Sequence, residues 1–266
     1  MHSRHTNIPR RPWSSITVGL LTIVVVLALW EIVSRIGLYN PQLFPPPTQI
    51  AITFFQMVKS GEWLRDLGAS LSRYGVGFLL GTFLGILLGI LTGRIQLLRD
   101  SLSPLLNFLR STPSVALIPL AIVWFGIGEP QKIFVVAWGV TFPLWLNTHA
   151  GVSEVEREYV WAARSLGAKG WRIYLEVYLP HALPFIIAGT RMGIATAFFA
   201  LAAAEMSGAF SGVAFRIFYS YQLFRTDKMM VAILTIGFLG IVSDRVFVHV
   251  VRWLLPWWKG EGRVSN

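Results

Sequence analysis

The residue types that most often carry catalysis or hold a metal are few and scattered in this chain. The five histidines, His2, His5, His149, His181 and His249, are too far apart for an HExxH motif or a comparable ligand set. The absence of cysteine excludes disulfides, thiolate metal sites and a cysteine nucleophile. No GxxxxGK[ST] loop is present to cradle the phosphates of a nucleotide. The sequence therefore predicts a protein that is not an enzyme, holds no metal or cofactor and does not itself hydrolyse ATP.

Two opposite charges stand inside long apolar stretches, Arg191 in one and Asp244 in the next. A lone charge at the centre of a bilayer costs about 2.5 to 3.5 kcal/mol on insertion scales, so these two are predicted to form an intramembrane ion pair facing the bundle interior. Two alternatives remain. Arg191 could extend to the cytoplasmic headgroups, and Asp244 could pair with a loop cation or with Arg245 of a partner chain.

The composition indicates that Arg191 and Asp244 lie within a membrane. The chain is 54% hydrophobic and only 14% charged, and its apolar residues form long runs. Its 266 residues could make two soluble domains by length, but six spans of about 20 residues use nearly half of them. We therefore expect an all-α, polytopic membrane protein with one domain over 1–266 and a core at about 60–255. The net charge of +10 is spread over many loops, which favours contact with anionic membrane lipids and not with nucleic acid.

Six apolar stretches are candidates for membrane spans, each bounded by charge, Pro or Gly. They cover about 16–38, 74–93, 113–127, 131–149, 183–206 and 229–255, and the third is the shortest. If the N-terminus lies inside, the loops 94–112 and 150–182 and both tails hold thirteen cations, against seven in the outer segments. The positive-inside rule then places both termini in the cytoplasm. The first span resembles a signal peptide at its start but has no Ala-x-Ala-like cleavage site, so we expect it to be uncleaved.

Two further patterns describe how the spans are connected and packed. Pro45, Pro46 and Pro47 exclude helix after the first span, and 48–73 is predicted to be an amphipathic helix on the outer surface, broken at Gly61. This helix lies in the headgroup plane or docks a soluble partner. The second span carries a glycine at every fourth position: Gly77, Gly81, Gly85, Gly89 and Gly93. Such a stripe allows a neighbouring backbone to approach closely, which favours helix packing over a hinge or a pore lining.

The loop of about 150–182 is the most informative segment. Acidic residues from Glu154 to Glu158 suit a helix N-terminus, and Gly167 suits a left-handed C-terminal position, so 154–166 is predicted to be helical. A second helix is predicted from about Trp171 to Leu179, ending before Pro180. The small residues Ala162 and Ala163 leave a low surface beside Leu166, which suits the groove of another protein.

This loop resembles the EAA loop of binding-protein-dependent importer permeases. The family pattern is Glu-Ala-Ala, three residues, Gly, nine residues and Ile-x-Leu-Pro. In this chain Ala162 and Ala163 are followed by Gly167 and then by Leu179 and Pro180 at the same spacing. Trp161 stands in place of the family's glutamate, which leaves open the ion pair that this glutamate would make with an ATPase but keeps the docking shape. Arg164, Ser165 and Leu166 lie inside the motif and are expected to contact the ATPase as well.

The resemblance extends from about Leu43 onward. Segments such as LRSTPSVALIPLAIVWFGIGEPQKIF, FPLWLNTHAGV and AAEMSGAFSG look like permeases for nitrate, taurine and aliphatic sulfonates, or bicarbonate, which are mostly small anions. The family implies a type I ABC importer permease fold in the bacterial inner membrane and a homodimer of the permease. It also implies two copies of an ABC ATPase, which hold ATP and Mg²⁺, and a periplasmic or lipid-anchored solute-binding protein.

If the chain is an importer, specific roles can be predicted for the charged residues Glu205 and Arg191. Glu205, among small residues near the outer end of the fifth span, is predicted to line or brace the translocation path, and Glu205→Gln is then expected to lower transport without lowering the amount of protein. The alternative is an interfacial glutamate held by water. For an imported anion, Arg191 is a candidate cation on the path.

Two other functions remain as alternatives. Importers of pyrimidine vitamin precursors or riboflavin have similar permeases. An ion-coupled secondary transporter is more remote, because the two halves show no convincing repeat and Glu205 and Asp244 are its acidic candidates.

Overall fold

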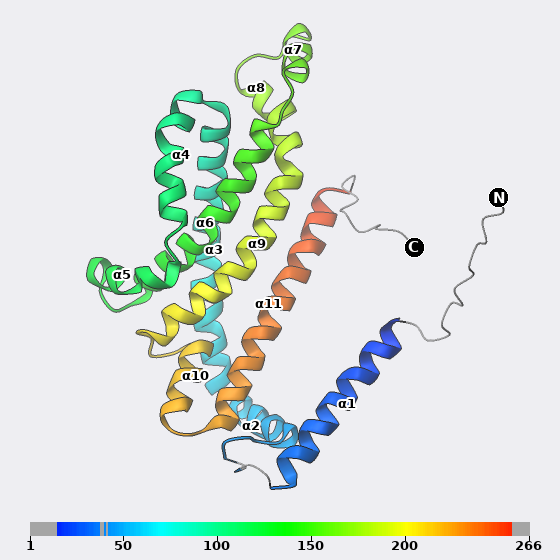
Figure 1. The fold of residues 1–266 in the computed structure, drawn as a ribbon, viewed down its shortest axis with the longest axis vertical. Helices are drawn as coiled ribbons and strands as arrows, with labels where there is room; N and C mark the ends of the chain where they lie inside the picture. Colours follow the sequence, from blue (N-terminus) through cyan, green and yellow to red (C-terminus); the bar gives the residue numbers. More distant parts are fainter. Residues whose placement is uncertain (1–14, 38–39, 41, 257–266) are drawn as a thin grey trace, which may run out of the picture.

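The computed structural model describes residues 15–37, 40 and 42–256, and all regular elements in this part of the chain are helical. Within these described residues, five helices are long and apolar enough to cross a membrane: α1 (Ser15–Arg35), α3 (Glu62–Arg94), α6 (Glu129–Ser153), α9 (Leu179–Met206) and α11 (Thr226–Leu254). The shorter α2 (Pro47–Lys59) and α10 (Val213–Gln222) lie at one end of the molecule, and α7 (Arg157–Ser165) and α8 (Trp171–Ile173) at the other (Figure 1). The all-α, polytopic prediction is confirmed. The tails that carry the predicted cytoplasmic termini lie outside the described residues.

The core forms around α6, which packs against α3 and α9. Val135, Val136, Val140 and Leu144 of α6 are completely buried, and small residues of α9 such as Ala200 pack with them. In a bilayer the lipid tails are as apolar as the side chains, so such helices are held by close packing and hydrogen bonds. These three helices form the part of the fold to which the functional segments are attached.

The glycine stripe of α3 faces α6 along its whole length. A Cβ atom added to Gly81 would lie 2.5 Å from the carbonyl oxygen of Ala137, and one added to Gly85 would lie 2.6 Å from that of Thr141. Such distances are shorter than real Cβ atoms allow, and backbone atoms cannot rotate away. The backbones of α3 and α6 are therefore close enough that only glycine fits between them.

Gly81→Ala is expected to lower the stability of the permease by about 1 to 3 kcal/mol, the usual cost of overpacking a tight interior. Gly75→Ala is the matched control, because no atom lies within 4 Å of a Cβ placed at Gly75. Thermal unfolding of the detergent-solubilised protein measures the difference. Equal unfolding temperatures for the two variants would show that the stripe is not a packing seam.

The third predicted span is wrong in its bounds. Residues 94–112 were expected to form a cytoplasmic loop, but most of them form the helix α4 (Gln96–Arg110). A 3₁₀ turn, η1 (Ser114–Leu117), and the eight-residue α5 (Ile118–Phe125) follow. The chain bends by 89° between α4 and this second part, and six spans are reached only if the bent pair counts as one. At about 1.5 Å per residue, α5 is roughly 12 Å long and too short to cross a bilayer alone.

The N-terminal region follows its predicted breaks. α2 ends at Lys59, Gly61 adopts the left-handed φ of 75° that glycine favours, and α3 begins at Glu62. The residues from Glu62 to Arg73 are not a separate surface helix, because they continue into the second span as one helix of 33 residues. α1 leans away from the other spans and contacts mainly α2 (Figure 1).

Candidate coupling loop and membrane-embedded charges

The loop between α6 and α9 projects beyond the ends of both helices (Figure 1). Its first helix, α7, begins at Arg157, three residues later than predicted, because Glu154 closes α6 and Glu156 is the N-cap of α7. The second predicted helix is wrong at its end. α8 has only three residues, a π-helical turn (Tyr174–Tyr178) follows, and the chain runs directly into α9. Leu179 and Pro180 thus lie directly after the π-helical turn, inside a continuous helical segment and not at the end of a helix.

Gly167 forms the tight turn after α7. Its φ of +88° is left-handed, its N–H binds the carbonyl of Arg164, and the N–H of Ala168 binds the carbonyl of Ala163. These bonds satisfy carbonyl groups that the end of the helix leaves open. No atom of the described chain lies within 4 Å of a Cβ placed at Gly167.

The loop combines an anchored inner face with an apolar outer face. Val160, Ala168, Ile173 and Tyr178 are buried with residues of α6 and α9. Five large hydrophobic side chains of the loop are exposed, most of all Leu166 at 89% and Trp171 at 70%; the others are Tyr159, Trp161 and Leu175. Ala162 and Ser165 are also exposed, and Ala163 is half-buried. An apolar surface on a segment held rigidly outside the membrane spans indicates a protein partner.

The opposite end of the bundle holds a buried network of charges around Glu205. The carboxylate is 0% exposed and accepts hydrogen bonds from the Ser70 hydroxyl at 2.7 and 3.0 Å, from Nη1 of Arg73 at 2.7 Å and from the backbone N–H of Ala214 at 3.0 Å. Arg73 also binds Glu129, the first residue of α6. Glu205 is therefore held by protein groups and not by water, and in this structure it faces no open path.

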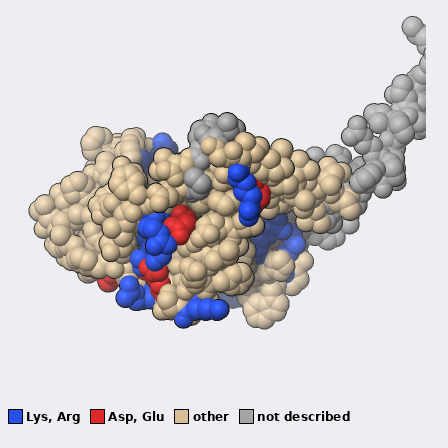
Figure 2. Space-filling model, turned by 90° about the horizontal axis from the view of Figure 1, so that it is seen from below, with Lys and Arg blue, Asp and Glu red and all other residues tan. Residues whose placement is uncertain are grey.

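A second part of the network ties α10 and α11 to α3. Arg216 of α10 lies 2.7 Å from Asp66 and 2.5 Å from Glu62, and Lys228 of α11 lies 2.7 Å from Glu62. Asp66 also accepts the N–H of Gly212. Seen from the α10 end of the molecule, cations and anions lie next to one another on an otherwise uncharged surface (Figure 2). Together the two parts join four spans and α10 at one end.

Sequence reasoning missed this network because it counted Arg73, Arg216 and Lys132, which lies 3.3 Å from Glu129, among the seven cations of the outer segments. Arg73 is 3% exposed, and Lys132 and Arg216 are 2% and 5% exposed. One signal was available in α3. Asp66, Ser70 and Arg73 precede the glycine stripe at spacings of four and three residues, so they continue the same helix face. A stripe that changes from glycine to polar residues indicates that this face stays buried to the end of the helix.

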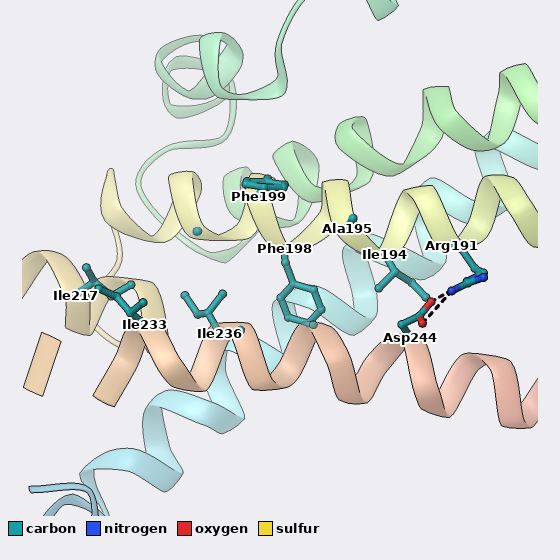
Figure 3. Close-up of a pocket in the computed structure, with 12 residues that line it drawn as sticks. Arg191, Ile194, Ala195, Phe198, Phe199, Ile217, Ile233, Ile236 and Asp244 are labelled. Atoms are coloured by element: carbon teal, nitrogen blue, oxygen red, sulfur yellow. Dashed lines mark hydrogen bonds and ion pairs between the residues drawn. The ribbon is translucent and has the colours of Figure 1, made fainter. Parts of the chain in front are cut away.

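Arg191 and Asp244 come together as a pair between α9 and α11. Nε and Nη2 of Arg191 lie 2.8 and 3.1 Å from the two carboxylate oxygens of Asp244, a bidentate contact (Figure 3). The pair is not deeply buried in the single chain: the Arg191 side chain is 54% exposed and that of Asp244 is 33% exposed. It therefore lies at the edge of a groove between the two helices.

Arg191→Ala and Asp244→Ala are each expected to lower the amount of folded permease, since each leaves one charge unpaired within the membrane. The double variant should recover part of the loss because neither charge remains. Fluorescence-detected size-exclusion chromatography measures the folded fraction. Losses that simply add in the double variant would mean that the contact contributes nothing to folding.

Comparisons with known proteins agree with this geometry. Residues 81–256 match the model of the family described as binding-protein-dependent transport system inner membrane component. The chain is 36% identical to a putative aliphatic sulfonates transport permease protein of Bacillus subtilis (strain 168), over 90% of this chain and 87% of the relative. It is 31% identical to the taurine transport system permease protein of Escherichia coli (strain K12), over 97% and 95% of the two chains. It is 32% identical to a bicarbonate transport system permease protein of Synechococcus elongatus, over 92% of each.

Solved structures support the fold alone. A chain of the MetNI methionine ABC transporter in an inward-facing conformation superposes with a TM-score of 0.59, at 23% identity, over 73% of this chain and 97% of that chain. An amino acid ABC transporter crystallised with histidines gives a TM-score of 0.57 at 17% identity, over 76% and 96%. The predicted fold of an ABC importer permease is thereby confirmed.

Proposed function

We propose, since this chain belongs to the inner membrane components of binding-protein-dependent transport systems, that it carries a small anion into the cytoplasm, driven by a separate ATPase docked on the α7–α8 loop. The observation that carries the proposal is this loop, which keeps the family's spacing from Ala162 to Pro180 and presents Leu166 and Gly167 away from the chain's own packing. An apolar surface of this kind fits the groove of a partner protein.

An anionic substrate is supported by the relatives, whose names refer to aliphatic sulfonates, taurine and bicarbonate. It is also supported by Arg191, a half-exposed cation at membrane depth. Intramembrane cations of this kind commonly mark the pathway of a substrate or ion. In this proposal Arg191 lies on the translocation path and Glu205, buried in the outer network, braces the helices around it.

Family membership supports the following assembly. Two copies of the permease form the pathway, two ATPase subunits hold ATP and Mg²⁺, and a periplasmic or lipid-anchored protein delivers the solute. The α7–α8 loop then faces the cytoplasm together with both termini, and α10 faces the outside. This orientation agrees with the excess of cations in the inner loops and tails.

Copurification tests the energy source. The tagged permease is expected to copurify with a cassette ATPase, and vesicles that contain both proteins and the solute-binding protein should take up alkylsulfonates only when ATP is supplied. Gradient-driven uptake by the permease alone would instead identify a secondary transporter. ATP-driven uptake of pyrimidine precursors or riboflavin, without uptake of sulfonates, would retain the importer and replace the substrate.

A further inference from the structure

A groove of about 470 Å³ runs between α9 and α11 (Figure 3). Its walls are apolar, with Ile194 and Phe198 on α9 and Ile236 on α11. By the helical rise, the groove extends about 16 Å along α9, from Arg191 to Ala202. Arg191 and Asp244 are its only charged lining residues, and both lie at one end.

The charged end of the groove has an excess of positive charge. Asp244 is bound by Arg191 and is followed in the chain by Arg245, an exposed residue that forms no ion pair with the described part of the chain. Arg191 alone binds the carboxylate, and Arg245 acts on it only through its electrostatic field. An incoming anion can take Arg191 while Arg245 remains beside Asp244, so the carboxylate is not left without a counter-charge.

The depth of this pair shows that the groove does not face lipid. Arg191 lies about 18 Å from the first residue of α9 and about 22 Å from the last, close to the middle of the span. An ion pair exposed at that depth is costly in contact with lipid tails, and such groups face water-filled cavities or other protein. In the proposed dimer of permeases this surface faces the translocation path, where water and solutes reach it.

We propose that the groove is a membrane-embedded binding station for organic anions that carry a short apolar chain. The anionic head takes the place of the Asp244 carboxylate on Arg191, and the chain lies along Ile194, Phe198 and Ile236. The inference rests on the proposed import of an anion and adds a preference among anions. Small hydrophilic anions such as bicarbonate or nitrate gain little from apolar walls, whereas each buried CH₂ group of an alkylsulfonate contributes about 0.8 kcal/mol.

Competition with Asp244 gives the station a property suited to transport. When the groove is empty, the carboxylate occupies the bidentate site on Arg191, so neither of these two charges is unpaired. A solute must break this contact to bind, so its affinity is weak and its release is rapid. Weak binding allows the solute to move on rather than remain trapped.

The complete lack of cysteine allows a direct test. Ala195→Cys places one thiol in the groove, and Phe238→Cys places one at similar depth on α11, at a residue that is 64% exposed and does not line the groove. Permeabilised membrane vesicles carrying the full chain are treated with sulfonatoethyl methanethiosulfonate or its trimethylammonium analogue. We expect the anionic reagent to label Ala195→Cys about tenfold faster than Phe238→Cys, a ratio that corresponds to about 1.4 kcal/mol.

Protection from labelling identifies the ligand. Hexanesulfonate should slow the labelling of Ala195→Cys, whereas nitrate, bicarbonate and the neutral hexanol should not at equal concentration. Arg191→Gln should abolish this protection and the preference for the anionic reagent, and Arg191→Lys should keep part of both. Rates are determined on the folded fraction, so a loss of folded protein does not alter them.

Three results would overturn the proposal: equal labelling of the two thiols, protection by hexanol as strong as by hexanesulfonate, or protection that persists in Arg191→Gln. The second result would identify a groove for a lipid chain. Failure here is distinct from failure of the proposed function. If uptake requires ATP but no solute protects the thiol in the groove, only the proposed binding site is contradicted. If uptake proceeds without an ATPase, the proposed importer function is contradicted.

Discussion

Gly167→Asp is expected to abolish uptake while the chain still inserts into the membrane and folds. A Cβ at Gly167 meets no atom of the described chain, so the added side chain projects outward, toward the ATPase in the proposed assembly. The left-handed backbone adds a local cost of about 1 to 2 kcal/mol for a residue with a Cβ atom. Measurements of uptake and of ATPase copurification should both fall to background.

Gly167→Asn separates the two effects. Asparagine tolerates the left-handed conformation better than most residues and has nearly the size of aspartate, but it carries no charge. We expect the Gly167→Asn variant to transport at a reduced rate and to copurify with less ATPase than the wild type. The Gly167→Ala variant should lie closer to the wild type because it adds only a methyl group. Wild-type transport by Gly167→Asp with a normally bound ATPase would contradict the docking assignment.

The features that could be predicted from the sequence are those that depend on local patterns. The break at Gly61, the turn at Gly167 and the glycine stripe of α3 each follow from residues close together in the chain. The pairing of Arg191 with Asp244 could be predicted from two facts: an unpaired charge in lipid is costly, and the two residues lie at similar depth.

The features that could not be predicted depend on contacts between distant segments. The bend between α4 and α5 occurs where the apolar run after Pro113 is too short for a span, and hydropathy does not say which way the chain turns. Pro180 indicated the end of a helix, but the preceding π-helical turn carries the chain into α9 without a break. Glu205 acquired its partners from α3 and α10, which sequence spacing does not bring together.

Glu205→Gln is expected to reduce the amount of folded permease strongly. All the groups that bind the carboxylate are donors: the hydroxyl of Ser70, the guanidinium of Arg73 and the N–H of Ala214. An amide replaces one acceptor oxygen with a donor and removes the charge opposite Arg73. Breaking a buried ion pair on one side typically costs about 3 to 5 kcal/mol. From the sequence alone, Glu205→Gln was expected to lose transport at an unchanged protein level. Because Glu205 is buried, the variant is now expected to lose both transport and folded protein.

Glu129→Gln is the matched control, because Glu129 binds the same Arg73 but its side chain is 57% exposed. Its loss should be smaller, since water solvates the amide and Arg73 keeps Glu205 as a partner. Lys132, which is 2% exposed and lies 3.3 Å from Glu129, then keeps only the neutral amide oxygen as a partner, so some loss remains. Folded yield and unfolding temperature in detergent, measured beside uptake per folded molecule, separate the two roles of Glu205. If Glu205→Gln unfolds at the wild-type temperature and loses only transport, the carboxylate acts on the path and the buried network is not what holds the outer ends of α3, α9 and α10 together.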